Sequence, residues 1–231
     1  MRPEEKRRFK DEIFAQFARI GKALSSGCRL ELLELLAQGE RGVEDLAIET
    51  SQSVPNISQH LQVLRHAQLV ESRREGNYIR YRLADENVLH LWVALRDLGQ
   101  ARLAEIDRLV QTYLKDRNAL EAITCAELER RIKDGGAVVL DVRPPQEFAA
   151  GHIASARSIP VAELRMRIRE IPKRRIIVAY CRGPYCVFAD QAVGILRDAG
   201  YKALRLDGGF PEWQMKGMPV ERGAVEVAGN R

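Results

Sequence analysis

The hydrophobic pattern of this chain changes near residue 120, and that change limits the folds available to it. Before it, apolar residues recur at helical spacing, as in "CRLELLELLAQGE" and "VPNISQHLQVLRHAQLV". After it, short apolar runs such as "AVVLDV" and "RIIVAYC" alternate with helix-like runs such as "VFADQAVGILRDAG". The first pattern predicts packed helices, and the second predicts an α/β domain with a largely parallel sheet.

We therefore expect two domains, a mainly helical one over residues 1–118 and an α/β one over residues 119–231, with a linker within residues 117–123. No apolar run approaches the roughly 20 residues that cross a bilayer, so no membrane contact is expected. The charged start "MRPEEKRRFK" is followed by no signal-like apolar segment, and the four cysteines are too sparse for a disulfide framework. Both features predict a cytoplasmic protein.

The expected elements before residue 85 occur in the order of a winged helix-turn-helix domain. A short helix over "GVEDLAIET" precedes the helix over "VPNISQHLQVLRHAQLV", and "LVESRREGNYIRYRL" indicates two strands around a turn. A DNA major groove about 12 Å wide admits one helix, whose first polar residues reach base edges. The predicted base-reading residues are Ser53, Asn56, Ser58, Gln59 and His60. The hairpin arginines Arg73, Arg74 and Arg80 are predicted to contact the DNA backbone or a minor groove.

Bulk charge does not favour DNA binding by this half. The net charge is +5 over the whole chain, yet residues 1–120 hold 19 basic and 18 acidic side chains. A nucleic-acid surface must therefore come from local clustering, and a polar helix face can equally be only solvated.

The segment "ENVLHLWVALRDLGQARLAEIDRLVQTYL" predicts one long amphipathic helix. Its apolar stripe needs a partner, and in a domain this small another subunit is the natural one. We therefore expect a homodimer.

The stretch from "SSGCRLELLELL" to "EGNYIRYRL" resembles the ArsR/SmtB family of winged-helix repressors over roughly residues 15–115. The resemblance implies a homodimer joined by its terminal helices and repression relieved by an inducer. Metal-sensing members carry a Cys-x-Cys motif in the helix that here reads "GVEDLAIE", so no metal site is expected. Members that sense sulfane sulfur use a pair of cysteines in this domain, whereas this half holds only Cys28.

The loop "CRGPYC" offers three kinds of chemistry. Zinc needs about four ligands, and Cys181 and Cys186 have no neighbouring Cys or His in the sequence. A disulfide requires a suitable Cα separation. A nucleophile is favoured by the position of Cys181 between a strand and a helix, where backbone N–H groups and the helix dipole stabilise a thiolate and an anion. The residues alone leave these alternatives open.

The pieces "LDVR", "EFAAGHI", "CRGPYC" and "LDGGFPEW" resemble a single rhodanese domain over roughly residues 123–220. The resemblance implies a possible sulfurtransferase in which Cys181 is the catalytic nucleophile that forms a persulfide. Asp141 and Arg143 of "LDVR" match a motif that we interpret as structural. The residues that match the substrate-binding loop are Arg182, Gly183, Tyr185, Cys186 and Val187.

Two departures from the usual rhodanese loop change the expected chemistry. Pro184 has no N–H to donate, and Cys186 replaces an arginine, which removes a fixed charge for a dianion. Thiosulfate is therefore expected to be a poorer donor than a persulfide. Cys186 is instead a candidate resolving thiol that attacks the persulfide of Cys181 and leaves a disulfide.

The combined expectation is a transcriptional repressor that binds a double-stranded DNA operator and whose Cys181 senses or transfers sulfur from a small donor, with no cofactor. One alternative is a sulfurtransferase that the DNA-binding half only localises or autoregulates. Another is a thiol/disulfide redox sensor through Cys181 and Cys186. Cys28 and Cys125 are either small buried residues or further thiols in the response, and a helix N-terminus would favour the thiolate of Cys125.

Overall fold

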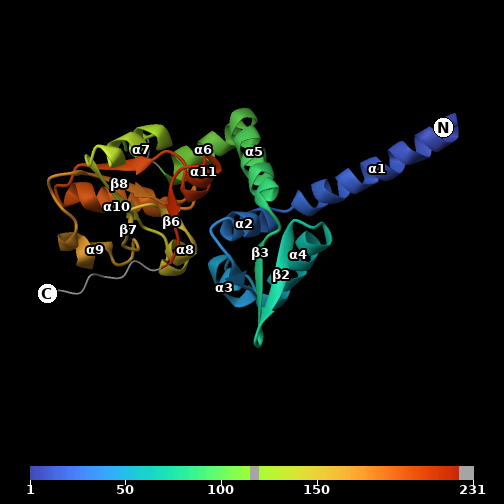
Figure 1. Ribbon diagram of the computed structural model, residues 1–231, viewed down its shortest axis with the longest axis horizontal. Helices are drawn as coiled ribbons and strands as arrows, with labels where there is room; N and C mark the ends of the chain where they lie inside the picture. Colours follow the sequence, from blue (N-terminus) through green and yellow to red (C-terminus); the bar gives the residue numbers. More distant parts are fainter. Residues whose placement is uncertain (115–119, 224–231) are drawn as a thin grey trace. The chain divides into compact units, whose positions relative to one another are not determined.

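The computed structural model describes residues 1–114 and 120–223, and these divide into two compact units between Leu95 and Arg96 (Figure 1). The first has the winged helix-turn-helix fold and the second the rhodanese-like α/β fold, as predicted. The predicted domain boundary after residue 118 lies outside the described residues and stays a prediction. Of the expected linker, Ala122–Ile123 already forms a strand of the α/β sheet.

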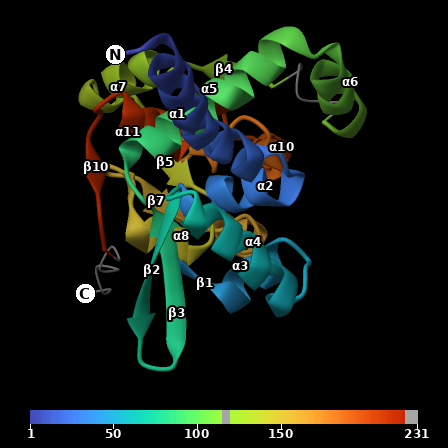
Figure 2. The same cartoon turned by 90° about the vertical axis from the view of Figure 1, so that its right-hand side faces the viewer.

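The winged-helix unit consists of short helices and a small antiparallel sheet with strand order β1-β3-β2. Its elements are α1 (Pro3–Leu24), α2 (Gly27–Leu36), β1 (Arg41–Gly42), α3 (Val43–Glu49), α4 (Val54–His66), β2 (Val70–Glu75) and β3 (Tyr78–Leu83). Gly76 adopts a φ of +62° in the turn between β2 and β3, a conformation that suits glycine. Figure 2 shows the resulting hairpin projecting beyond α3 and α4.

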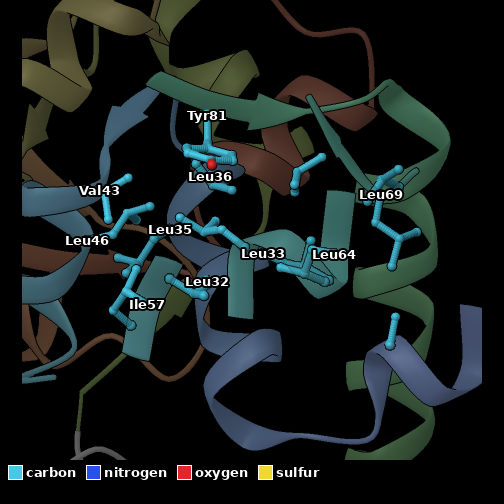
Figure 3. Close-up of a cluster of buried hydrophobic side chains, with 14 of the residues drawn as sticks. Leu32, Leu33, Leu35, Leu36, Val43, Leu46, Ile57, Leu64, Leu69 and Tyr81 are labelled. Carbon is cyan, nitrogen blue, oxygen red and sulfur yellow. The ribbon is translucent and has the colours of Figure 1, made fainter. Parts of the chain in front are cut away.

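The core of this unit fixes α4 against the helices before it (Figure 3). Leucines of α2 pack with Leu46 of α3 and with Ile57, Leu61 and Leu64 of α4, and these side chains are almost fully buried. Tyr81 of β3 lies in the same cluster. Because the apolar positions of α4 face this core, its polar positions are left on the outside.

The predicted single helix over residues 86–114 is wrong in one respect, because it is broken at Leu103. The chain forms α5 (Glu86–Arg102) and α6 (Ala104–Tyr113), and Leu103 between them has an extended backbone with φ −108° and ψ 98°. Gly99 and Ile106 approach each other across this break. A Cβ at Gly99 would lie 3.3 Å from Ile106 Cδ1 of α6, a close contact that the glycine avoids.

The rhodanese-like unit is built on a parallel sheet with strand order β4-β9-β8-β5-β7. Its strands are β4 (Ala122–Ile123), β5 (Ala137–Asp141), β7 (Arg157–Ser158), β8 (Ile176–Tyr180) and β9 (Ala203–Leu206), and β6 (His152–Ile153) pairs separately with β10 (Val220–Glu221). Its helices are α7 (Cys125–Lys133), α8 (Pro145–Ala150), α9 (Leu164–Arg167), α10 (Val187–Asp198) and α11 (Phe210–Met215), and a 3-10 turn spans Ile168–Glu170.

Alternate residues of the central strands supply two cores, one on each face of the sheet. Leu140 and Ala179 pack toward α9 and α10, whereas Val139 and Val178 pack toward α7, α8 and α11. Cys181 follows β8 directly and belongs to the α10 side. The carboxyl end of β8, at the centre of the sheet, is therefore what positions the cysteine loop.

Candidate nucleic-acid interface and cysteine site

The start of α4 is capped as the sequence predicts. The Ser53 hydroxyl accepts the backbone N–H of Asn56 at 3.4 Å, and Pro55 lies in the first turn. The side-chain amide of Asn56 donates to Gln52 Oε1 at 2.9 Å. The first turn of the helix is thus held in place by side chains that remain partly accessible.

The other predicted base-reading residues differ in exposure. Gln59 is exposed, whereas Ser58 and His60 are half-buried. His60 Nδ1 lies 3.5 Å from Arg29 Nη1, and the other terminal nitrogen of Arg29, Nη2, donates to the Lys22 carbonyl at 3.0 Å. On α4, Gln59 is therefore the most open of the three, while His60 is tied to the end of α1 through Arg29.

Most arginines of the β2–β3 hairpin are paired with carboxylates. Arg73 contacts Glu40 at 2.7 Å and Glu75 at 3.4 Å, and Arg80 also pairs with Glu75. Arg82, which the sequence places on the same hairpin, pairs with Glu71 at 2.7 Å.

Arg74 differs from these three arginines. It donates to the Gly76 carbonyl at 3.0 Å and has no carboxylate partner among residues 1–114 and 120–223. The hairpin therefore offers one arginine whose charge is not offset by a neighbouring acid.

The two cysteines of the "CRGPYC" loop meet across it. Cys181 Sγ and Cys186 Sγ form a disulfide, and their Cα atoms lie 6.3 Å apart. Cys181 is 1% exposed, whereas Cys186 is half-buried at the N-cap position of α10. Of the two sulfur-bearing residues, Cys186 is thus the more accessible one.

The backbone around the loop is closely packed. The Cys186 N–H donates to the Gly183 carbonyl at 3.2 Å, and the Cys181 carbonyl accepts the N–H of Phe210 at 3.1 Å. A Cβ at Gly209 would lie 2.5 Å from Gly183 N, so only glycine fits there. Because Pro184 has no N–H and Cys186 uses its own within the loop, two positions of the expected anion cradle donate nothing to a ligand.

Arg182 does not point its charge into an open site. Its Nη2 contacts Glu147 Oε1 of α8 at 2.6 Å, and its guanidinium stacks 5.6 Å from the centre of the Phe188 ring. Glu147 is not among the site residues that the sequence predicts, although the motif "EFAAGHI" contains it. Glu147 is 2% exposed, and a glutamate buried to this extent needs a cationic partner. The sequence does not show which residues are buried, so it gave no sign of this pair.

Asp141, Arg143 and Tyr180 form a buried polar cluster beneath the loop. Arg143 Nη2 contacts Asp141 Oδ2 at 2.6 Å and the Gly151 carbonyl at 2.7 Å, and the Tyr180 hydroxyl donates to Asp141. All three side chains are inaccessible to solvent. They tie the ends of β5 and β8 together and are enclosed away from any ligand.

Neither remaining cysteine is activated. Of the two alternatives for Cys125, the structure supports the small buried residue, because the side chain is 0% exposed at the start of α7 and burial raises the pKa of its thiol. Burial and the nearby Glu31 also raise the pKa of Cys28. Both thiols are therefore poor nucleophiles at neutral pH.

Known protein families match both halves of the chain. The model of the bacterial regulatory protein arsR family matches residues 27–72, and the rhodanese-like domain model matches residues 124–216. An HTH-type transcriptional regulator, Rv0324 of Mycobacterium tuberculosis, is 46% identical over 93% of this chain and 94% of its own length. The chain belongs to the ArsR family of regulators and carries a rhodanese-like domain.

Other relatives cover one half each of this ArsR-family regulator. A protein named sulfurtransferase from Allochromatium vinosum is 37% identical over 42% of this chain and 92% of its own length. A solved homodimeric winged helix-turn-helix DNA-binding domain from Mycobacterium bovis is 44% identical, covers 41% of this chain and 87% of its own, and has a TM-score of 0.39.

The helix α4 residues and the cysteine loop lie within the two matched regions, whereas the hairpin arginines from Arg73 onward lie outside them. The arsR match runs from α2 through α4 into β2 and so includes Ser53, Asn56 and Gln59. The rhodanese match includes the whole cysteine loop. In the described part of this regulator, no cluster of three or more His, Cys, Asp or Glu could hold a metal ion, and no helix there has the length and apolar character of a membrane span.

Proposed function

We propose that this ArsR-family regulator is a repressor that binds a DNA operator as a homodimer in the cytoplasm, and that reactive sulfur changes this binding at the Cys181–Cys186 loop. The observation that carries the proposal is the disulfide across the loop. It joins the residue that matches a rhodanese nucleophile to a second thiol within bonding reach. The loop can therefore take up sulfur and discharge it without a second protein.

The proposed chemistry has two steps. The Cys181 thiolate attacks the outer sulfur of a persulfide R–S–SH, which forms Cys181–S–SH and releases the thiolate RS⁻. The Cys186 thiolate then attacks Cys181 Sγ, which forms the disulfide and releases HS⁻. The two cysteines lose two electrons, and the persulfide is reduced to a thiol and sulfide. Two equivalents of a small thiol reverse the change and leave as a disulfide.

The surroundings of the loop favour a persulfide over thiosulfate as the donor. Thiosulfate is a dianion that needs cations and N–H donors. Here Arg182 is engaged by Glu147, and Pro184 has no N–H to donate. A donor with a smaller negative charge loses less binding free energy in a site that lacks these cations and N–H donors.

The DNA-binding part of the proposal rests on α4 and the β2–β3 hairpin. Gln59 and Asn56 lie toward the start of α4 with accessible side chains, where a helix in the major groove presents its base-reading residues. Arg74 supplies charge at the hairpin. These residues are proposed to read bases and to contact phosphates, respectively.

The dimer is proposed to use α1 as part of its interface. Phe9, Phe14 and Phe17 are 58%, 64% and 60% exposed and, with Ile13, follow one face of the helix. Only Ala23 among the α1 residues is buried. A row of exposed phenylalanines is stable in water when a second copy covers it.

The test is an operator titration with the full-length protein, reduced or treated with polysulfide. Wild type and Cys28→Ser should change affinity on treatment, whereas Cys181→Ser should not. Cys186→Ser should retain one added sulfur on Cys181, detectable by mass spectrometry. A Cys181→Ser protein that responds as wild type does would exclude this loop as the sensor.

Sulfur transfer remains the second candidate function, because a relative named sulfurtransferase matches this domain. The two functions differ in turnover. If the loop closes to a disulfide after each uptake, wild type should release sulfide in a single stoichiometric burst, and Cys186→Ser should transfer sulfur to cyanide repeatedly. Sustained turnover by wild type, with unchanged operator affinity, would favour the enzyme.

A further inference from the structure

The side chain of Glu212 in α11 bridges two separate parts of the rhodanese-like unit. Its Oε2 accepts the backbone N–H of Gly209 at 2.7 Å, and its Oε1 contacts Arg96 Nη1 of α5 at 2.5 Å. The side chains of Arg96 and Glu212 are only 8% and 13% exposed. Solvent screens such a pair weakly, so loss of Arg96 would leave the largely buried Glu212 carboxylate without this cationic partner.

The Gly209 end of this bridge lies directly against the cysteine loop. A Cβ on Gly209 would lie 2.6 Å from the Cys181 carbonyl oxygen and 2.5 Å from Gly183 N. The next residue, Phe210, donates its N–H to the same Cys181 carbonyl at 3.1 Å. The turn that Glu212 holds is therefore in contact with the backbone of the reactive residue.

The Arg96 end of the bridge belongs to a helix that is also anchored elsewhere. Helix α5 begins at Glu86, and its Val88 is part of the hydrophobic core of the winged-helix unit. Arg96 is further held by Asp97 at 2.9 Å. One continuous helix thus carries a core residue of the DNA-binding unit and the arginine that pairs with Glu212.

We propose that Glu212 is a positioning residue that couples α5 to the cysteine loop through Arg96 on one side and Gly209 on the other. This inference rests on the proposed function for its biological meaning. Coupling between two sites is reciprocal, so a contact that transmits the state of the loop to α5 also changes the stability of the loop disulfide. The bridge should therefore affect both operator binding and the thiol–disulfide equilibrium of the loop.

The test uses the full-length variants Glu212→Gln and Arg96→Met. Glu212→Gln keeps a hydrogen-bonding side chain but loses the charge that pairs with Arg96. Arg96→Lys keeps the positive charge and serves as the conservative variant. The matched control is Arg167→Met, which removes an arginine paired with Glu163 and Glu170 in the same unit. No described contact of Arg167 involves the loop.

The first measurement is the thiol–disulfide equilibrium of the Cys181–Cys186 pair in a glutathione redox buffer, without DNA. Glu212→Gln and Arg96→Met should shift the equilibrium constant about fivefold or more, the lower end of typical coupling, while Arg167→Met leaves it unchanged and Arg96→Lys largely restores it. Equilibrium constants for Glu212→Gln and Arg96→Met equal to that of Arg167→Met would overturn the inference.

The second measurement is the ratio of operator affinities between the oxidised and reduced protein. The ratio should move toward one in Glu212→Gln and Arg96→Met but not in the control Arg167→Met. A ratio that keeps its wild-type value in both Glu212→Gln and Arg96→Met would also overturn the inference. If wild type itself shows no such ratio, the proposed sensing function fails, and the glutathione equilibrium still decides whether Glu212 positions the loop.

Discussion

Gly209→Ala should displace the cysteine loop through steric overlap alone. Gly209 has a φ of −158°, an extended conformation that alanine adopts without strain. The added Cβ would lie 2.5 Å from Gly183 N and 2.6 Å from both Arg182 C and the Cys181 carbonyl oxygen, whereas ordinary contacts begin at 3.4 Å. These are backbone atoms that cannot rotate away. Overpacking of this kind costs about 1–3 kcal/mol, and contact with three backbone atoms places the cost at the upper end.

The assay is urea unfolding, with Gly194→Ala as the matched control. Gly194 lies in α10, and nothing lies within 4 Å of its added Cβ, so alanine there should stabilise the protein by roughly 0.5–1 kcal/mol through helix propensity. Gly209→Ala should also speed attack of a small thiol on the loop disulfide, because displacement of the loop opens access to the half-buried Cys186 sulfur. Equal unfolding midpoints for Gly209→Ala and wild type would refute the steric argument.

Arg74→Ala should reduce the salt dependence of operator binding more than Arg73→Ala, because carboxylates already offset the charge of Arg73; equal salt slopes would contradict this. Tyr180→Phe should cost about 1–3 kcal/mol in urea unfolding, since it removes a buried hydroxyl that donates to Asp141. Burial raises the folded-state pKa of Cys125 above its ordinary value of 9.0, so the folded protein keeps a proton that the unfolded chain releases. The free energy of unfolding should therefore fall as pH rises past 9, and less steeply in Cys125→Ala; identical slopes between pH 7.5 and 10 would exclude this contribution.

Features that depend on neighbouring residues were predictable from the sequence. The Ser53 cap, the β2–β3 hairpin and the strand that ends before Cys181 each follow from a pattern a few residues long. The break at Leu103 was not, because no proline or turn signal marks it, and the close approach of Gly99 to Ile106 joins residues seven positions apart. A uniform apolar stripe therefore predicted one helix where tertiary packing makes two.

Charge pairs between residues far apart in the chain could not be predicted from the sequence either. Arg182 and Glu147 are 35 residues apart, and Arg96 and Glu212 are 116 apart. Composition shows that each charge exists but not which partner it meets. For Arg182 this changes the chemistry, since the sequence assigned it to anion binding and the fold directs it to a buried glutamate. Its role in the candidate site as a ligand-binding residue stays a prediction.

The unequal exposure of the two loop cysteines bears on how the proposed switch resets. Thiol–disulfide exchange depends on which sulfur an incoming thiolate can reach. Cys186 is half-buried at the start of α10, whereas Cys181 is enclosed, so a reducing thiol is expected to attack Cys186 and to release Cys181 as the leaving thiolate. The same residue that accepts sulfur from a persulfide would then leave as the thiolate in the reducing direction, ready to react again. Reduction of the disulfide would need only an accessible Cys186. A second cysteine at this position therefore suits a sensor better than the arginine expected in a thiosulfate-binding loop.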